Sequence, residues 1–110
     1  MTYQHKDLAS GGWAKLSFLE QMANIGSEIE RALNWKAKGN ADYSRLAFER
    51  SLELIDLTLD SNMNPSHFKE LTRMREAIAD YFFGTNQFMS TEASWRAYFM
   101  PFALAARKHR

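Results

Sequence analysis

The 110-residue chain contains no cysteine and no valine, and it has only two prolines and five glycines. Without cysteine it can form neither a disulfide nor a thiolate metal site, and it has no thiol nucleophile. The shortage of β-branched residues, and the lack of any stretch in which apolar and polar residues alternate, argue against a β-sheet. These absences favour an all-helical fold.

Long hydrophobic runs are also missing. No apolar run approaches the roughly 20 residues that a helix needs to cross a bilayer, and the first 12 residues have no apolar core of the kind found in a signal peptide. The 45% apolar and 14% aromatic content is nevertheless enough for one modest core. We therefore expect residues 1–110 to form a single cytoplasmic domain.

The formal charge of +1 is distributed unevenly along the chain. Residues 40–62 carry two arginines against five carboxylates, whereas residues 90–110 carry four lysines and arginines against one carboxylate. A nucleic-acid-binding surface normally needs a larger basic surplus on one face. We therefore do not expect direct binding to nucleic acid.

Glycine- and asparagine-rich breaks divide the chain into four segments with helical periodicity. The predicted helices span residues 13–38, 41–60, 65–83 and 91–108, with Asn40 and Asn64 as N-caps and Pro65 at a first helical position. Because the connections are short, consecutive helices should be antiparallel neighbours. The sequence predicts an up-and-down antiparallel four-helix bundle.

Two of the helices have features that affect packing. The second has apolar residues on two sides, so we expect neighbours on both, with an acidic row between them (Glu49, Glu53, Asp56 and Asp60). Pro101 falls inside the fourth helix, where it removes the hydrogen bond to the carbonyl of Ala97. A kink in the last two turns should result.

Residues for catalysis or metal binding are not arranged in any recognisable pattern. The three histidines (His5, His67 and His109) do not follow a Glu at the spacing of a di-iron bundle. The chain also lacks a glycine-rich phosphate loop, a serine nucleophile elbow and zinc-ligand spacing. We predict no catalytic residue, no metal site and no cofactor.

Arg75 interrupts the apolar stripe of the third helix, between Leu71 and Ile78. Burying an arginine without a partner costs several kcal/mol. Its stem could instead cover apolar surface while its head reaches solvent. Alternatively, it could pair with a carboxylate of the acidic row, such as Glu49 or Glu53.

The segment Arg75-Glu76-Ala77-Ile78-Ala79-Asp80, followed by Tyr81 and Phe82, resembles the signature of HEPN-type helical bundles. Their relatives include the substrate-binding subunits that accompany small nucleotidyltransferases. In that family an Arg is usually followed by Asn, and a His stands about five residues later. Here Glu76 replaces the Asn, and Asp80 stands where the His would be.

The resemblance implies a role for Arg75, and the departures from it limit that role. Family members that cut RNA are thought to use the Arg and His together, whereas Asp80 would repel a phosphodiester and has the wrong pKa to replace an imidazole. The resemblance therefore implies a non-cleaving protein that binds a partner or a nucleotide, and a nucleotidyltransferase is the partner it suggests. The alternatives are a HEPN-type RNA-directed nuclease and a nucleotide-binding module, and the candidate binding residues are Arg73, Arg75, Asp80 and Tyr81.

Aromatic residues outnumber those that the predicted stripes can cover. Trp35 and Tyr3 lie outside these stripes, and the fourth helix carries Tyr98 and Phe99 on different sides. Surplus apolar surface is commonly covered by a second copy of the chain or by another protein. The alternative is that the loops and termini of the chain fold over these aromatic residues. We predict a non-enzymatic interaction domain, with a homodimer or another protein as partner and Trp35, Tyr98 and Phe99 as candidate interface residues.

Overall fold

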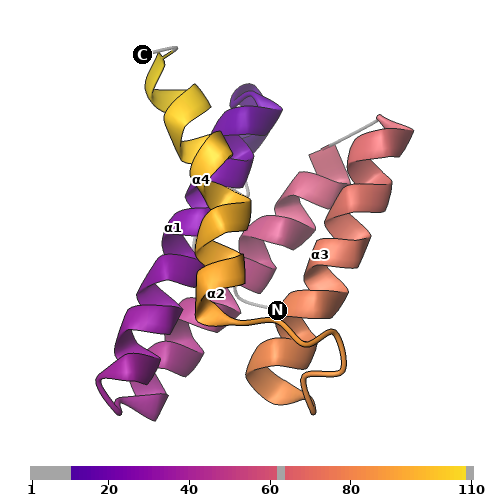
Figure 1. The fold of residues 1–110 in the computed structure, drawn as a ribbon. Helices are drawn as coiled ribbons and strands as arrows, with labels where there is room; N and C mark the ends of the chain where they lie inside the picture. Colours follow the sequence, from indigo (N-terminus) through magenta and orange to yellow (C-terminus); the bar gives the residue numbers. More distant parts are fainter. Residues whose placement is uncertain (1–10, 62–63, 109–110) are drawn as a thin grey trace.

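The computed structural model describes residues 11–61 and 64–108, and it confirms the predicted all-α fold. Four helices, α1 (Phe18–Ala37), α2 (Ala41–Ser61), α3 (Pro65–Phe83) and α4 (Glu92–Lys108), run alternately down and up, as Figure 1 shows. Within these two described ranges there is no strand. Three residues named above, Tyr3, His5 and His109, lie outside the described ranges.

The start of α1 differs from the prediction. Residues Trp13–Lys15 form a short 3-10 helix, η2, and α1 begins only at Phe18. The reason is a capping box, in which the Ser17 side chain accepts from the backbone N–H of Glu20 and the Glu20 carboxylate accepts from that of Ser17. The chain therefore turns between Trp13 and Ser17 instead of continuing as one helix.

The predicted caps of α2 and α3 are present. The Asn40 side chain accepts from the backbone N–H of Tyr43, 3.0 Å away, at the start of α2. The Asn64 side chain accepts from the N–H of Ser66, with Pro65 at the first turn of α3. Gly39 joins α1 to α2 with a φ of 77°, a left-handed conformation that glycine adopts without strain.

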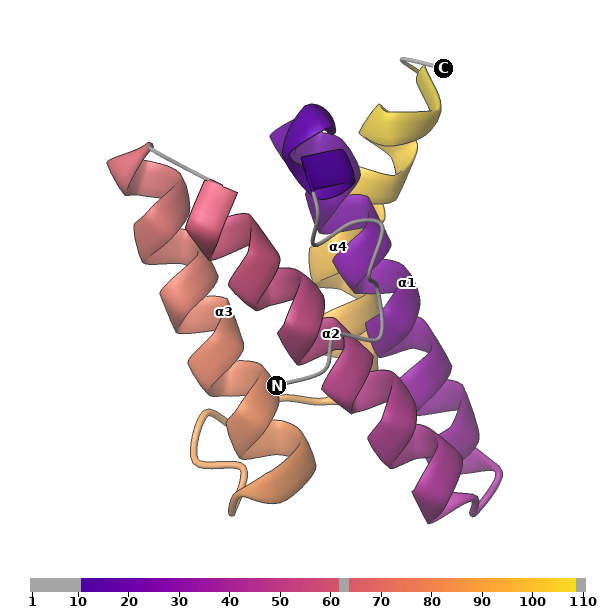
Figure 2. The same cartoon turned by 180° about the vertical axis from the view of Figure 1, so that it is seen from behind.

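Helix α1 forms the centre of the packing, because it lies closely against both α2 and α4. Helix α2 lies between α1 and α3 in Figure 2, which confirms that it has neighbours on two sides. The fully buried side chains come mainly from these helices and from η2: Trp13, Met22, Ile25, Ile29, Phe48, Ile55, Leu71 and Ile78.

One consecutive pair of helices departs from the expected arrangement. Helices α3 and α4 approach each other less closely than α1 approaches α2 and α4, so their seam is an open groove. Helix α4 continues through Pro101 to Lys108, and its C-terminal turns diverge from the start of α1 in both views (Figures 1 and 2). As a result, α4 has a groove on each side.

Candidate protein-interaction surface

Arg75 does form an ion pair with the acidic row of α2, and Asp56 is its partner. The Nε of Arg75 donates to Oδ1 of Asp56 at 2.9 Å, and both side chains are about 40% exposed (41% and 40%). The two carboxylates offered as examples, Glu49 and Glu53, are not the ones used. The pair joins α3 to α2 at a half-exposed position, which gives Arg75 a structural role.

Asp80 organises the connection between α3 and α4. Its two carboxylate oxygens accept from the backbone N–H groups of Gln87, at 2.9 Å, and Phe88, at 3.1 Å. In the same loop the Asn86 amide exchanges two hydrogen bonds with the backbone of Ser90. The carboxylate that stands where the HEPN-type histidine would be is therefore used to hold a loop.

The four candidate binding residues do not converge on one site. Arg75 points toward α2, whereas Arg73 is exposed on the rim of the groove between α3 and α4. Tyr81 packs edge-on against Trp95, with the Nζ of Lys36 over its ring at 4.4 Å from the centroid. These contacts hold helices together and leave no shared cavity for a ligand.

The three candidate interface residues have different surroundings. Phe99 is only 6% exposed, because it packs against α1. Trp35 is half-buried and meets Tyr43 edge-on, with the ring centroids 4.8 Å apart. Tyr98 is half-buried in the groove between α3 and α4. Phe99 therefore belongs to the internal packing of the chain, and Tyr98 remains at a surface.

Helix α4 has a second apolar stripe that was not predicted from the sequence. Ala93, Ala97, Met100 and Leu104 are all exposed, Met100 by 58% and Leu104 by 51%. They recur at the i, i+4, i+7, i+11 spacing of one helix face. We call this set the α4 stripe. Its spacing is visible in the sequence, but its exposure follows from where α1 and α3 lie.

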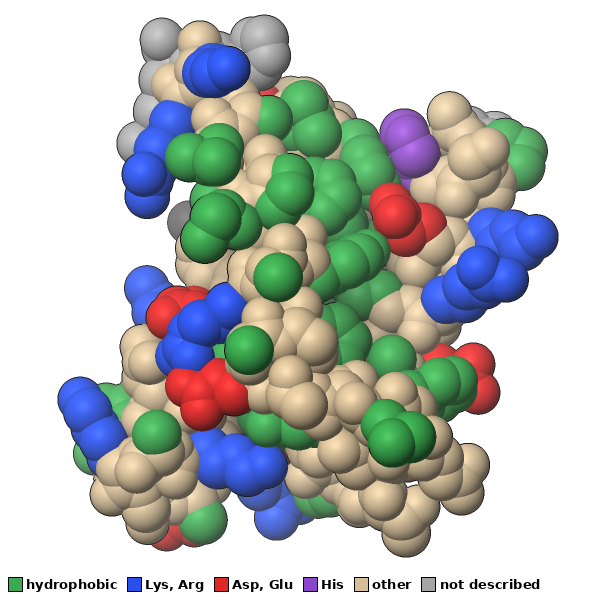
Figure 3. All heavy atoms as spheres, viewed as in Figure 1, with side chains coloured by type: hydrophobic (Ala, Val, Ile, Leu, Met, Phe, Trp, Pro, Cys, Tyr) green, Lys and Arg blue, Asp and Glu red, His purple; other side chains and the backbone are tan. Residues whose placement is uncertain are grey.

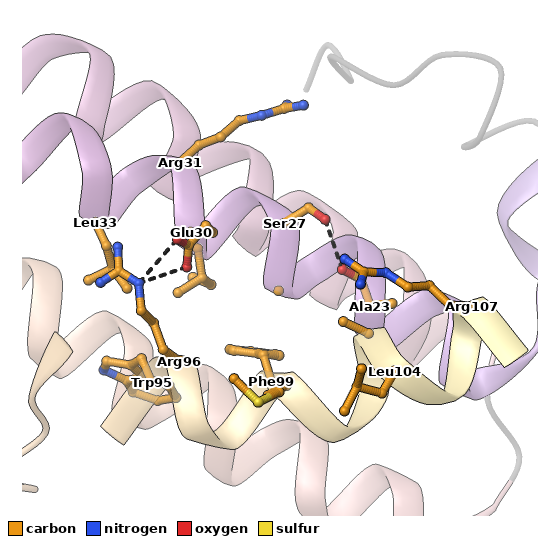
Figure 4. A pocket seen from close by; sticks show the side chains of 14 residues that line it. Ala23, Ser27, Glu30, Arg31, Leu33, Trp95, Arg96, Phe99, Leu104 and Arg107 are labelled. Atoms are coloured by element: carbon orange, nitrogen blue, oxygen red, sulfur yellow. Dashed lines mark hydrogen bonds and ion pairs between the residues drawn. The ribbon is translucent and has the colours of Figure 1, made fainter. Parts of the chain in front are cut away.

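Two residues of the α4 stripe, Met100 and Leu104, line a groove between α1 and α4 of about 630 Å³ (Figure 4). Small side chains of α1, Ala23 and Ser27, lie on one side, and Leu104 and Arg107 lie on the other. Near one end Arg96 of α4 reaches across to Glu30 of α1, with an Nε to Oε2 distance of 3.0 Å. The groove is thus mainly apolar along α4, with arginines at its edges.

The second groove, between α3 and α4, lies on the other side of α4. It is lined by Glu70, Arg73, Met74 and Ala77 from α3 and by Trp95 and Tyr98 from α4. Figure 3 shows hydrophobic side chains in a band between these two helices. Helix α4 therefore has incompletely covered apolar surface on both sides.

Neither a metal site nor a membrane span is evident in the described ranges. No group of three or more metal-ligating side chains is present among residues 11–61 and 64–108. The ring of His67 stacks on that of Phe18, with their centroids 3.7 Å apart. None of the four helices, as far as the structure describes them, has the length and apolarity that crossing a membrane requires.

Comparisons with known proteins give no relatives. No protein-family model matches the sequence, and no curated protein or solved structure is significantly similar to it.

Tyr98 of α4 and Glu70 of α3 both line the groove between these helices. Burial raises the pKa of the Tyr98 hydroxyl well above its usual value, and the negative charge of Glu70 adds to the effect. The unfolded chain releases this proton near pH 10, whereas the folded chain retains it to higher pH. The contribution of Tyr98 to the free energy of unfolding is therefore fully present below about pH 10, and it decreases as the pH rises above that value.

We expect the free energy of unfolding to decrease less steeply with rising alkaline pH in Tyr98→Phe than in the wild type. The wild-type loss attributable to one such group is at most about 1.4 kcal/mol per pH unit, and less here because the ring is partly exposed. Urea unfolding at several pH values between 7 and 11 measures it. The matched control is Tyr43→Phe, since Tyr43 is 51% exposed on α2. If the free energy of unfolding decreased equally steeply with pH in the two variants, the prediction would be contradicted.

Proposed function

We propose that the protein is a non-enzymatic helical interaction domain that binds another protein chain through α4. The observation that carries this proposal is the composition of α4, in which residues 97–106 include no charged side chain although only α1 covers the helix closely. A helix that is apolar on all sides is normally buried. Met100 is 58% exposed and Leu104 is 51% exposed, which supports the proposal that a partner covers this surface.

The contacts of Arg75 and Asp80 favour a binding role over the two alternatives, a nuclease and a nucleotide-binding module. Asp56 holds Arg75, and the loop amides of Gln87 and Phe88 occupy Asp80. A phosphate would have to compete with Asp56 for the guanidinium. The resemblance to subunits that accompany small nucleotidyltransferases suggests the class of assembly, and we place it in the cytoplasm.

Single cysteines test this proposal sharply, because the natural chain has none. In cells that produce Leu104→Cys, we expect a maleimide to label position 104 several-fold more slowly than position 46 in Leu46→Cys. Leu46 is the matched control, since it is an exposed leucine (42%) on α2. After denaturation the two cysteines should react equally fast.

Equal labelling of the two positions in cells would overturn the proposal, because it would mean that no chain covers α4. Protection of position 104 that depends on a co-expressed nucleotidyltransferase would support the specific assembly that the resemblance suggests. Protection without any nucleotidyltransferase would support the interaction domain and reject that particular partner.

A further inference from the structure

The α4 stripe has an unequal distribution of side-chain size along the helix. Its N-terminal half presents two alanines, Ala93 and Ala97, and its C-terminal half presents two large side chains, Met100 and Leu104. All four are exposed. A stripe of this kind fits best against a surface in which large and small residues follow in the opposite order.

An antiparallel copy of α4 provides that order. When position 93 of one helix lies opposite position 104 of the other, position 97 necessarily lies opposite position 100. Each alanine then faces a large side chain, so that the two helices interdigitate in one register about a two-fold axis. The α4 stripe is in this sense complementary to itself.

The charges at the ends of α4 favour the same orientation. The helix begins with Glu92 and ends with Arg107 and Lys108. Glu92 is paired with Arg96 one turn later, so these two charges offset each other at the start of α4. In an antiparallel pair each basic end lies near this neutral start, and the helix dipoles are also opposed. In a parallel pair the two basic ends would meet and repel each other.

The groove beside the α4 stripe gives a second helix space to pack. In Figure 4 Ala23 and Ser27 of α1 present only small side chains toward the groove, with Leu104 and Arg107 opposite them. A helix seated there would contact α1 as well as α4, since helices pack with their axes roughly 8–10 Å apart. The groove therefore extends the contact beyond one pair of helices.

We propose that the partner covering the α4 stripe is a second copy of this chain, bound through antiparallel α4 helices with Ala93 opposite Leu104 and Ala97 opposite Met100. This inference rests on the proposed function and adds the identity of the partner. It concerns the α4 stripe, of which Met100 and Leu104 line the groove with α1 and no residue lines the groove between α3 and α4, so the latter groove stays accessible in the dimer.

Cysteine cross-linking tests the register. An equimolar mixture of Ala93→Cys and Leu104→Cys, treated with an oxidant, should give disulfide-linked dimers from up to about half of the chains, because random exchange makes half of the dimers mixed. Either variant alone should stay unlinked, since two cysteines at the same position lie roughly 16 Å apart along the helices. Cross-linking of Ala93→Cys with itself would indicate a parallel pair and would overturn the proposal.

Light scattering supplies an independent measurement. We expect twice the monomer mass of 12.8 kDa for the wild type at tens of micromolar, and the monomer mass for Leu104→Glu. The control Leu46→Glu places the same charge at an exposed leucine of α2 and should remain dimeric. Circular dichroism checks that both variants are folded. A monomeric wild type, or a dimeric Leu104→Glu, would overturn the proposal.

The failure of this proposal is distinguishable from failure of the proposed function. If position 104 is protected in cells but the mixed cysteine variants do not cross-link, α4 binds a different protein and only the self-pairing is wrong. If position 104 is also unprotected, both proposals are wrong.

Discussion

Replacing Trp13 with alanine should lower the free energy of unfolding by about 3–5 kcal/mol, the usual cost of truncating a buried tryptophan. Trp13 is only 2% exposed, although it lies outside the four long helices. Its indole Nε1 donates to Oγ1 of Thr58 on α2 at 2.8 Å, and its carbonyl accepts from the Gln21 side chain at 2.9 Å. Trp13 thus attaches η2 to α1 and α2 at once.

Urea unfolding followed by circular dichroism measures the effect of Trp13→Ala. The free energy of unfolding of a small domain is only about 5–15 kcal/mol, so a loss of this size would shift the midpoint of unfolding to a much lower urea concentration. The matched control is Trp35→Ala, because Trp35 is half-buried at the surface of α1. If Trp13→Ala cost no more than Trp35→Ala, η2 would not be part of the core.

The limits of the helices were predictable where local chemistry sets them. Helix ends are set by caps and turns that involve only neighbouring residues, here Asn40, Asn64 and Gly39. Helices α2 and α3 begin directly after the two asparagine caps, as predicted. The start of α1 is also encoded locally, by the capping box of Ser17 and Glu20, whereas the predicted helix begins earlier, at Trp13. The burial of Trp13 depends on Thr58, 45 residues away, so no local pattern shows it.

The same distinction applies to the candidate surface. A charged residue in an apolar stripe predicts that Arg75 needs a carboxylate, but the choice of Asp56 depends on how α3 is rotated against α2. The bonds from Asp80 to Gln87 and Phe88 form only once the loop has closed. Similarly, periodicity shows that α4 is apolar on several sides, and only the packing decides which side stays exposed.

Replacing Gly26 with valine should lower the free energy of unfolding by about 1–3 kcal/mol, because the added side chain has no space between α1 and α4. A Cβ at Gly26 would lie 2.9 Å from the Cβ of Phe99, closer than such atoms approach in proteins. That atom is fixed to the backbone of α4, so rotating the Phe99 ring cannot relieve the contact. The gain in helix propensity, a few tenths of a kcal/mol, is too small to compensate.

The control for Gly26→Val is Asn24→Val, which places the same β-branched side chain on an exposed position of α1. It should change stability by no more than about 0.5 kcal/mol, as expected of surface substitutions. If Gly26→Val were as mild, α4 would not lie against α1 at this point. Because the α4 stripe belongs to the helix that valine displaces, Gly26→Val should also weaken the proposed dimer, whereas Asn24→Val should leave its mass unchanged. Light scattering on the two folded variants therefore links the internal packing of α4 to its external surface.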